Sequence, residues 1–261
     1  MKKRKKKKKN IKWMIKSKIS DIKQEIYKLI YGSIENAIAA DLYRAELKEE
    51  KKWKPDEGST LLEFDNRMRK EKIKFKIWSE LKYYCQEHPK ETRDIVLEFY
   101  NKSILLNDKA CYVGCLLSPE NHDLTPFFAK ELVRYANVNK LNKGILCDMY
   151  SNFFLYSKNI KYKETYLEIL NNDKLESERW GTMYVCGELK IEEAIPKLIE
   201  LTKEKGMIIF ALKSLKKYKK IELLPIFKKY IDDKNTTVRN IAKAAVASLE
   251  KKQQRLNNKI K

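Results

Sequence analysis

The feature that most constrains this chain is a spacing of small and apolar residues that recurs between residues 178 and 249. Counted from Glu178, Met207 or Val238, the positions 3, 4, 7, 8 and 11 places later are small or apolar in each case. These positions are Gly181, Thr182, Val185, Cys186 and Leu189; Phe210, Ala211, Ser214, Leu215 and Tyr218; and Ile241, Ala242, Ala245, Val246 and Leu249. Such a spacing is one face of an α-helix, so we expect three amphipathic helices that begin about 30 residues apart.

A second helix that carries a proline follows each of the first two. Pro196 follows its count origin, Glu178, at the same interval at which Pro225 follows Met207. The unit is therefore a helical hairpin, and a period of this length is typical of a solenoid.

Weaker copies of the unit lie upstream, with origins at Asp108 and Asn142. Pro126 stands in the same relation to Asp108 as the later prolines do to their origins. The expected inward positions are Cys111, Tyr112, Cys115 and Leu116 in one copy, and Ile145, Leu146, Met149, Tyr150 and Phe153 in the other. We predict an all-α fold: a right-handed α-solenoid of about five helical hairpins over residues 59–252, with a concave surface lined by the second helices.

Two segments of the sequence resemble the HEAT-repeat family, in particular the short repeats named after the phycobilisome lyases. Residues 186–201, which include Ala194-Ile195-Pro196, are similar to the family's turn from the first helix to the second. Val238-Arg239, followed by Ala242 and Ala245, is similar to its Val-Arg-x-x-Ala signature, and Arg179 occupies the place that matches Arg239. The resemblance implies a fold more than a function, because repeat solenoids carry many unrelated activities.

The remaining domain boundaries follow from charge and helix-breaking residues. Residues 1–10 form a basic run that we expect to be a disordered tail. Residues 11–54 predict amphipathic helices, and Pro55-Asp56-Glu57-Gly58 is the clearest break in the chain. Thr60 with Glu63 reads as a capping box that opens a helix towards Glu87, with a kink near Lys70 and an end at His88-Pro89. Residues 253–261 predict a basic C-terminal tail.

The net charge of +21 is concentrated at the two ends of the chain. Residues 1–60 hold 18 Lys and Arg against 9 Asp and Glu, residues 61–204 hold 23 of each, and residues 205–261 hold 16 against 4. Basic ends can attract nucleic acid or an anionic membrane face. A coding sequence rich in A and T would also raise the lysine content, but it does not predict the neutral middle.

The candidate anion-binding residues are the cations of the C-terminal units. They are Lys213, Lys216, Lys217, Lys220, Lys228, Lys229, Arg239 and Lys243. Stacked units could merge them into one basic ridge, which would position phosphates without reading sequence. The alternative is an ordinary solvated helical face, with Arg239 paired to an acidic residue such as Asp232 or Asp233. Trp180 lies off the apolar stripe, where its indole could stack on a base or pack between neighbouring units.

No pattern in the sequence predicts a catalytic, metal or cofactor site. Common catalytic signatures and phosphate-binding loops are missing. Cys111 and Cys115 lie one turn apart, with Cys186 near in the register, but all three fall on positions that the repeat assigns to the core. Five cysteines without zinc or disulfide spacing fit a reducing cytoplasm, and no run is long and apolar enough for a membrane span.

The expected function is that of a non-enzymatic scaffold that binds a protein partner on its concave surface. The first alternative is a nucleic-acid-binding solenoid, including a DNA glycosylase of the HEAT-like alkylation-repair type, in which Trp180 and nearby Glu178 would face a damaged base. A third hypothesis is attachment to an anionic membrane through the basic amphipathic residues 2–29.

Overall fold

The computed structural model describes residues 56–75, 78–136 and 143–260. The chain divides into two compact units, Met1–Asp56 and Glu57–Lys261. The predictions for residues 1–10 and 11–54 lie outside the described residues. Within those residues every regular element is helical, so the prediction of an all-α fold is confirmed there.

Twelve α-helices and five short 3₁₀-helices make up the described part of the second unit. The α-helices are α3 (Leu61–Lys70), α4 (Trp78–Glu87), α5 (Pro89–Lys102), α6 (Leu106–Cys115), α7 (Thr125–Ala136), α8 (Lys143–Tyr156), α9 (Lys163–Asn171), α10 (Trp180–Leu189), α11 (Ile195–Leu201), α12 (Ile208–Tyr218), α13 (Leu224–Lys228) and α14 (Thr236–Ile260). The 3₁₀-helices are η1 (Pro119–Leu124), η2 (Ile160–Tyr162), η3 (Asp173–Arg179), η4 (Glu192–Ala194) and η5 (Ile221–Leu223).

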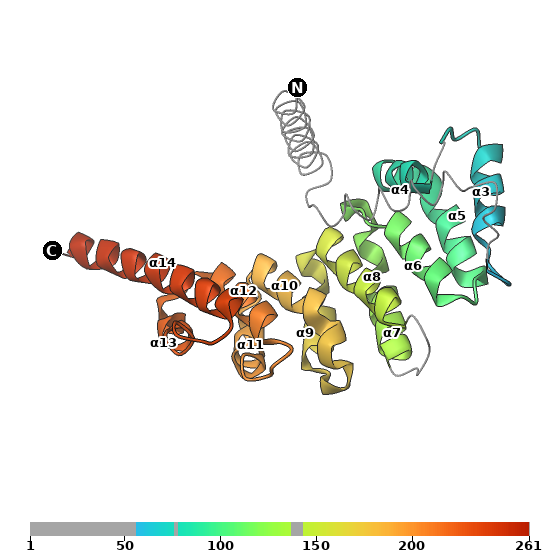
Figure 1. Cartoon of the computed structure of the whole chain (residues 1–261). Coiled ribbons are helices and arrows are strands. Elements are labelled where there is room, and N and C mark those ends of the chain that lie inside the picture. Colours follow the sequence, from blue (N-terminus) through green and yellow to red (C-terminus); the bar gives the residue numbers. More distant parts are fainter. Residues whose placement is uncertain (1–55, 76–77, 137–142, 261) are drawn as a thin grey trace, which may run out of the picture. The chain divides into compact units, whose positions relative to one another are not determined.

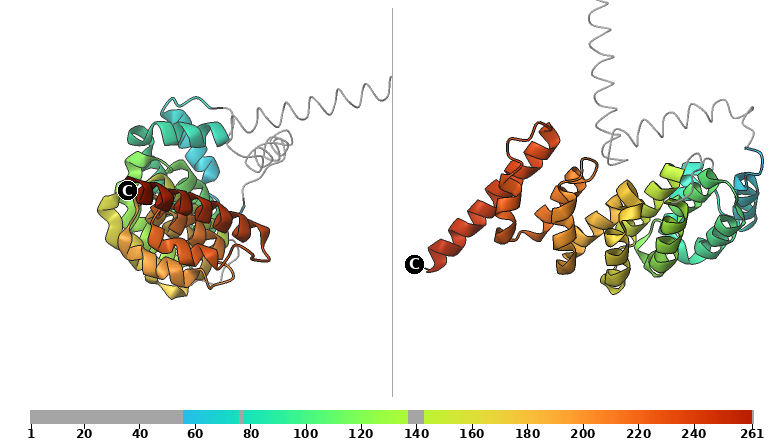
Figure 2. Two further views of the ribbon diagram at one scale, coloured as in Figure 1. Left: turned by 90° about the vertical axis from the view of Figure 1, so that its left-hand side faces the viewer. Right: turned by 90° about the horizontal axis from the view of Figure 1, so that it is seen from below.

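From α4 onward the helices pack in two rows that follow the chain order (Figure 1). The even-numbered helices form one row, in which α4, α6, α8, α10, α12 and α14 each contact the next. The odd-numbered helices α5, α7, α9, α11 and α13 lie beside them, and each packs against the even-numbered helix that follows it in sequence. Figure 2 shows the same succession of helices from two further sides.

The inward face predicted for α10, α12 and α14 is confirmed by its burial. These helices begin within two residues of the expected origins. Of the fifteen stripe positions, Leu189, Phe210, Ile241 and Val246 are half-buried and the others are buried. The apolar spacing therefore identifies the side of each helix that packs against the rest of the fold.

The prolines mark the starts of the odd-numbered helices. Pro126, Pro196 and Pro225 are each the second residue of their helix (α7, α11 and α13), and Pro89 is the first residue of α5. A proline is accommodated here because the first turn of a helix has no intrahelical acceptor for its N–H. A 3₁₀-turn (η1, η4 or η5) directly precedes each of α7, α11 and α13.

The predicted capping box at Thr60 is wrong. Thr60 precedes α3, but its side chain makes no capping hydrogen bond. Its hydroxyl lies 2.8 Å from Tyr112 Oη, and its backbone N–H donates to Asp108 Oδ2 at 2.7 Å. A tertiary contact to α6 thus replaces the local one.

The predicted kink near Lys70 is a full break, since α3 ends at Lys70 and α4 begins at Trp78. The predicted helix end at His88-Pro89 is confirmed, because α4 ends at Glu87 and α5 begins at Pro89.

One buried apolar core runs through the described part of the unit, from Phe64 on α3 to Leu249 on α14. None of the helices among these residues combines the length and the apolar content needed to cross a bilayer. The last helix continues to Ile260, but its side chains from 251 to 258 are all exposed.

Candidate interaction surface

Half of the candidate anion-binding cations are held in contacts with other elements. Lys217 Nζ lies 2.6 Å from Glu188 Oε1 on α10, and Lys228 Nζ lies 2.9 Å from Glu250 Oε1 on α14. Lys220 pairs with Glu192. The ammonium of Lys213 lies 5.9 Å from the centroid of the Tyr184 ring. Acidic partners from adjacent helices therefore compensate much of the charge that the sequence places here.

The other lysines stay candidates for anion binding. Lys216, Lys229 and Lys243 are exposed on α12, at the end of α13 and on α14, and make no ion pair among the described residues. Exposed pairs such as Lys217–Glu188 contribute little to stability, typically below about 1 kcal/mol, and they offset the charge of three of the eight candidate cations.

Arg239 is a structural residue of its own loop. Its guanidinium donates to the Asp233 carbonyl at 2.7 Å and to Thr236 Oγ1 at 3.1 Å. The pairing with the carboxylate of Asp232 or Asp233, which the sequence suggested as an alternative, is replaced by a bond to the Asp233 backbone. These bonds tie the start of α14 to the turn before it.

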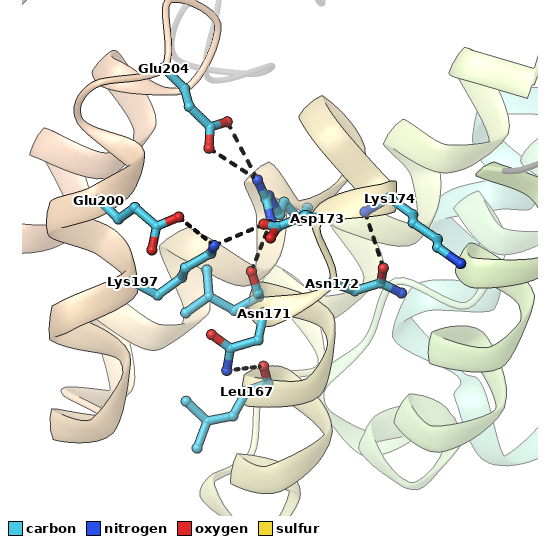
Figure 3. Close-up of polar contacts among 10 residues, drawn as sticks. Leu167, Asn171, Asn172, Asp173, Lys174, Lys197, Glu200 and Glu204 are labelled. Carbon is cyan, nitrogen blue, oxygen red and sulfur yellow. Dashed lines mark hydrogen bonds and ion pairs between the residues drawn. The ribbon is translucent and has the colours of Figure 1, made fainter.

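Arg179, at the matching place of the earlier unit, is buried and joins three parts of the chain. Its guanidinium donates to the Leu170 carbonyl at 3.2 Å and to Asp173 Oδ1 at 2.7 Å, and it lies 3.4 Å from Glu204 Oε2. Figure 3 shows Lys197 between Asp173 and Glu200, with 2.8 Å to each carboxylate. The two cations connect α9, η3, α10, α11 and the loop after α11.

The charge on Asp173 is strongly stabilised by this network. Hydrogen bonds from Arg179 and then Lys197 lower the pKa of the Asp173 carboxyl to about 2. Glu176, in the same 3₁₀ segment, has φ 42°, a left-handed conformation that a side chain disfavours. The network thus fixes a tight turn, and its carboxylates are already occupied by cations of the same chain.

Trp180 belongs to an aromatic cluster that we define as Trp180, Tyr184 and Phe210. All three rings are half-buried. The indole lies 6.0 Å from Tyr184, edge to face, and 5.8 Å from Phe210 at 31°. Tyr184 and Phe210 also meet edge to face at 5.9 Å. The cluster joins α10 to α12, so Trp180 packs against a neighbouring helix, in line with the alternative to stacking on a base.

A hydrogen bond fixes the indole to a third helix. Trp180 Nε1 donates to Asp148 Oδ1 on α8 at 2.9 Å. One turn earlier on α8 the apolar side chain of Ile145 is 53% exposed, so the prediction that Ile145 faces inward is wrong. Sequence reasoning named Glu178 as the carboxylate near Trp180 and missed Asp148, Tyr184 and the outward position of Phe210.

Charged side chains of both signs lie beside the aromatic cluster. Asp148 on α8 accepts from the Trp180 indole, and Lys213 on α12 lies 5.9 Å from the centroid of the Tyr184 ring. Glu188, one turn after Tyr184 on α10, pairs with Lys217, whose hydrogen bond is the largest cause that lowers the pKa of Glu188, and Lys158 lowers it further. Both carboxylates and ammonium groups therefore border the half-exposed apolar surface.

The cysteines differ in their surroundings, and a hydrogen bond with Cys115 lowers the pKa of the Cys85 thiol. Among the described residues no group of three or more His, Cys, Asp or Glu side chains is placed to hold a metal ion. Cys115 and Cys186 are buried, Cys111 is half-buried, and the thiol beside Cys115 is that of Cys85 on α4. Burial raises the pKa of Cys111 to about 11 and that of Cys186 to about 12, so these thiols stay protonated.

A buried polar cluster links α5, α6, α7 and α8. Tyr100 Oη lies 2.5 Å from Tyr150 Oη and donates to Glu131 Oε2 at 2.7 Å. Lys109 Nζ donates to the Tyr100 carbonyl at 2.6 Å, and its burial lowers the pKa of its ammonium. Because each of these groups has a partner within the fold, the cluster positions helices and offers no free group to a ligand.

Comparisons of this chain with protein-family models, with curated proteins and with solved structures give no match.

Proposed function

We propose that the described part of the second unit is a HEAT-like α-solenoid that acts as a non-enzymatic scaffold and binds a partner protein through the aromatic cluster. The solenoid part of the proposal is supported by the two rows of helices, by the inward stripes and by the prolines that stand second in α7, α11 and α13. Its right-handedness and its number of about five hairpins stay predictions from the sequence.

The observation that carries the binding part is the set of three half-exposed rings held in fixed geometry. Trp and Tyr are enriched among the residues that dominate binding energy at protein interfaces. Here neighbouring rings and the bond to Asp148 already restrain their rotamers, so a partner would have little side-chain entropy to remove.

The carboxylates beside the cluster favour a protein over a polyanion. Nucleic acid binding requires an excess of cations facing the phosphates, whereas here Asp148 accepts from the indole and Glu188 pairs with Lys217. The indole of Trp180 is also engaged by Phe210 on its ring and by Asp148 at its N–H, which leaves less of it for stacking on a base. Both arguments rank the glycosylase alternative below the scaffold.

The compartment we propose is the cytoplasm. The five cysteines are all free thiols, and four of them are buried, which fits a reducing environment. The hypothesis of membrane attachment concerns residues 2–29, outside the described residues, and stays a prediction.

A photo-crosslinking experiment in cells tests the proposal. A photoreactive phenylalanine derivative in place of Tyr184 should give a discrete protein adduct. The same derivative in place of Tyr83, an exposed tyrosine on α4, is the matched control and should not give that adduct. With the captured partner in hand, Trp180→Ala should weaken its binding by about 30-fold, the effect of a residue worth about 2 kcal/mol.

Two results would overturn the scaffold proposal. One is the same adduct from both positions, and the other is nucleic acid as the sole adduct at position 184. Circular dichroism of each variant verifies that the helices are retained.

A further inference from the structure

The C-terminal part of α14 extends beyond the contacts that hold the helix in the fold. The buried positions Val238, Ala242, Ala245 and Leu249 follow the inward face and end at Leu249. The helix continues to Ile260, and every side chain from Lys251 to Asn258 is exposed. Figure 2 shows α14 running on past α13 to the C-terminal end. We name residues 251–258 the basic segment.

The side chains of the basic segment are almost all hydrogen-bond donors. Its sequence is Lys-Lys-Gln-Gln-Arg-Leu-Asn-Asn, with three cations and four amides. No Asp or Glu follows Glu250 in the sequence, and Glu250 itself pairs with Lys228 on α13. Lys252 donates to the Lys219 carbonyl at 2.8 Å, a bond that leaves its charge uncompensated.

The two kinds of donor occupy different sides of the helix. At about 100° per residue, Lys251, Lys252 and Arg255 fall within about 100° of one another, and the four amides occupy the opposite half. Leu256, 44% exposed, lies between the two sides. The segment therefore has a charged side and an amide side along the same two turns.

This composition distinguishes among the possible occupants. A second copy of the segment would bring three cations against three, which is unfavourable. An interfacial membrane helix needs a broad apolar face, and the segment offers only Leu256. Duplex DNA supplies both complements, phosphates for the cations and base-edge acceptors and donors for the amides.

We propose that the basic segment of α14 binds the major groove of duplex DNA. An α-helix is about 10–12 Å across and the B-form major groove is about 12 Å wide, so an exposed helix can enter it. Lys251, Lys252 and Arg255 contact phosphates of one strand while the amides face the base edges. The A-form groove of duplex RNA is too narrow and deep for such a helix, so RNA is not the partner.

The test measures binding of the full chain to a short mixed-sequence DNA duplex by fluorescence anisotropy between 50 and 200 mM NaCl. The test variant is K251Q/K252Q/R255Q. The control K174Q/K203Q/K205Q removes the same charge from exposed lysines elsewhere on the unit. Loss of three phosphate contacts should lower the slope of log affinity against log salt by about 2.7. Across this salt range the wild-type affinity should therefore fall about 40-fold more than that of the test variant.

The control should keep most of the wild-type slope. An equal loss of slope in the two variants would overturn the proposal, because net charge alone would then account for the binding. Unchanged binding by the test variant would also overturn it, because residues outside the segment would then bind the DNA. So would equal affinity for duplex RNA, or a stronger dependence on these three residues for flotation with phosphatidylserine vesicles than for DNA.

Discussion

At the scale of single residues, two arginines at matching positions of the predicted repeat make different hydrogen bonds. Arg179 and Arg239 each donate to the aspartate six residues before them. Arg179 is buried and bonds the carboxylate of Asp173, whereas the less buried Arg239 bonds the carbonyl of Asp233. Arg179 therefore joins elements of neighbouring hairpins, whereas Arg239 joins only the residues of its own turn.

Asp173 should make stability depend on pH in the acid range. Its pKa is lowered to about 2 in the folded chain, against about 3.9 when unfolded, so its ionised form stabilises the fold. Asp173→Asn should lower the free energy of unfolding at pH 7. The difference from wild type should shrink as the pH falls through about 4 and vanish near 2. Urea unfolding at several pH values measures it.

Asp232→Asn is the control for this experiment, because Asp232 is exposed and makes no ion pair among the described residues. It should leave the free energy of unfolding close to that of wild type throughout. A difference for Asp173→Asn that stayed constant with pH would contradict the role given to its charge.

The contacts of Lys217 with Glu188 and of Lys213 with Tyr184 could have been predicted from the period of the repeat. Glu188 occupies the same place after its origin, Glu178, as Lys217 does after Met207. Tyr184 and Lys213 are equivalent in the same sense. Equivalent places on stacked hairpins become neighbours, so opposite charges there predict pairs. The bonds of Thr60 and Trp180 could not be predicted, because their acceptors, Asp108 and Asp148, lie in different elements at no fixed spacing.

At the scale of elements, the closeness of α10 to both neighbours in its row depends on two glycines. A methyl group at Gly181 would lie 2.4 Å from the Ser151 carbonyl oxygen of α8, and one at Gly187 2.8 Å from the Ser214 carbonyl oxygen of α12. The inward stripe predicted a small residue at 181. It gave no signal at 187, which lies off that stripe.

Gly181→Ala should therefore destabilise the protein by about 1–3 kcal/mol, the usual cost of overpacking, and Gly187→Ala by less. Gly144→Ala on α8 is the matched control, because its added methyl group meets nothing within 4 Å. It should be neutral or stabilise by up to about 0.5 kcal/mol through helix propensity. Urea titrations give the three values, and equal stabilities for Gly181→Ala and Gly144→Ala would contradict the contact.

Helix ends were harder to predict than helix faces. α10 and α12 both end at a lysine in the left-handed conformation, Lys190 at φ 53° and Lys219 at φ 52°, where a glycine would be the usual signal. The carbonyl of Cys186 near the end of α10 accepts from Tyr218 Oη at 2.9 Å. The neighbouring helix thus supplies a contact that local sequence does not reveal.

At the scale of the whole unit, stability should vary along the helices because contacts are made mainly between neighbours. The side chains of residues 251–258 are all exposed, so the amides of these residues should exchange with deuterium faster than those of residues 238–249, which pack on α12 and α13. Hydrogen-exchange mass spectrometry measures this difference. Added DNA duplex should slow exchange in the basic segment of the wild type and leave that of K251Q/K252Q/R255Q unchanged.

The order of the helical hairpins was predictable at this scale, because a recurring apolar face needs no knowledge of distant contacts. The aromatic cluster was predictable only in part. Trp180 departs from the apolar stripe, which marks it as a candidate. Phe210 lies on the stripe, where the spacing predicts an inward side chain, and the same rule also fails at Ile145 of α8. The missing information was the direction of α8, whose Asp148 holds the indole at the surface.

The packing of each odd-numbered helix on the even-numbered helix that follows it has a consequence for synthesis. On the ribosome, an odd-numbered helix emerges before the segment that covers its apolar side. The nascent chain therefore carries one uncovered helix at each stage, and the next segment to emerge closes it. Maturation proceeds in steps of one hairpin: an interruption just after α11 would leave that helix without α12, and an interruption just after α12 would leave α12 without α14.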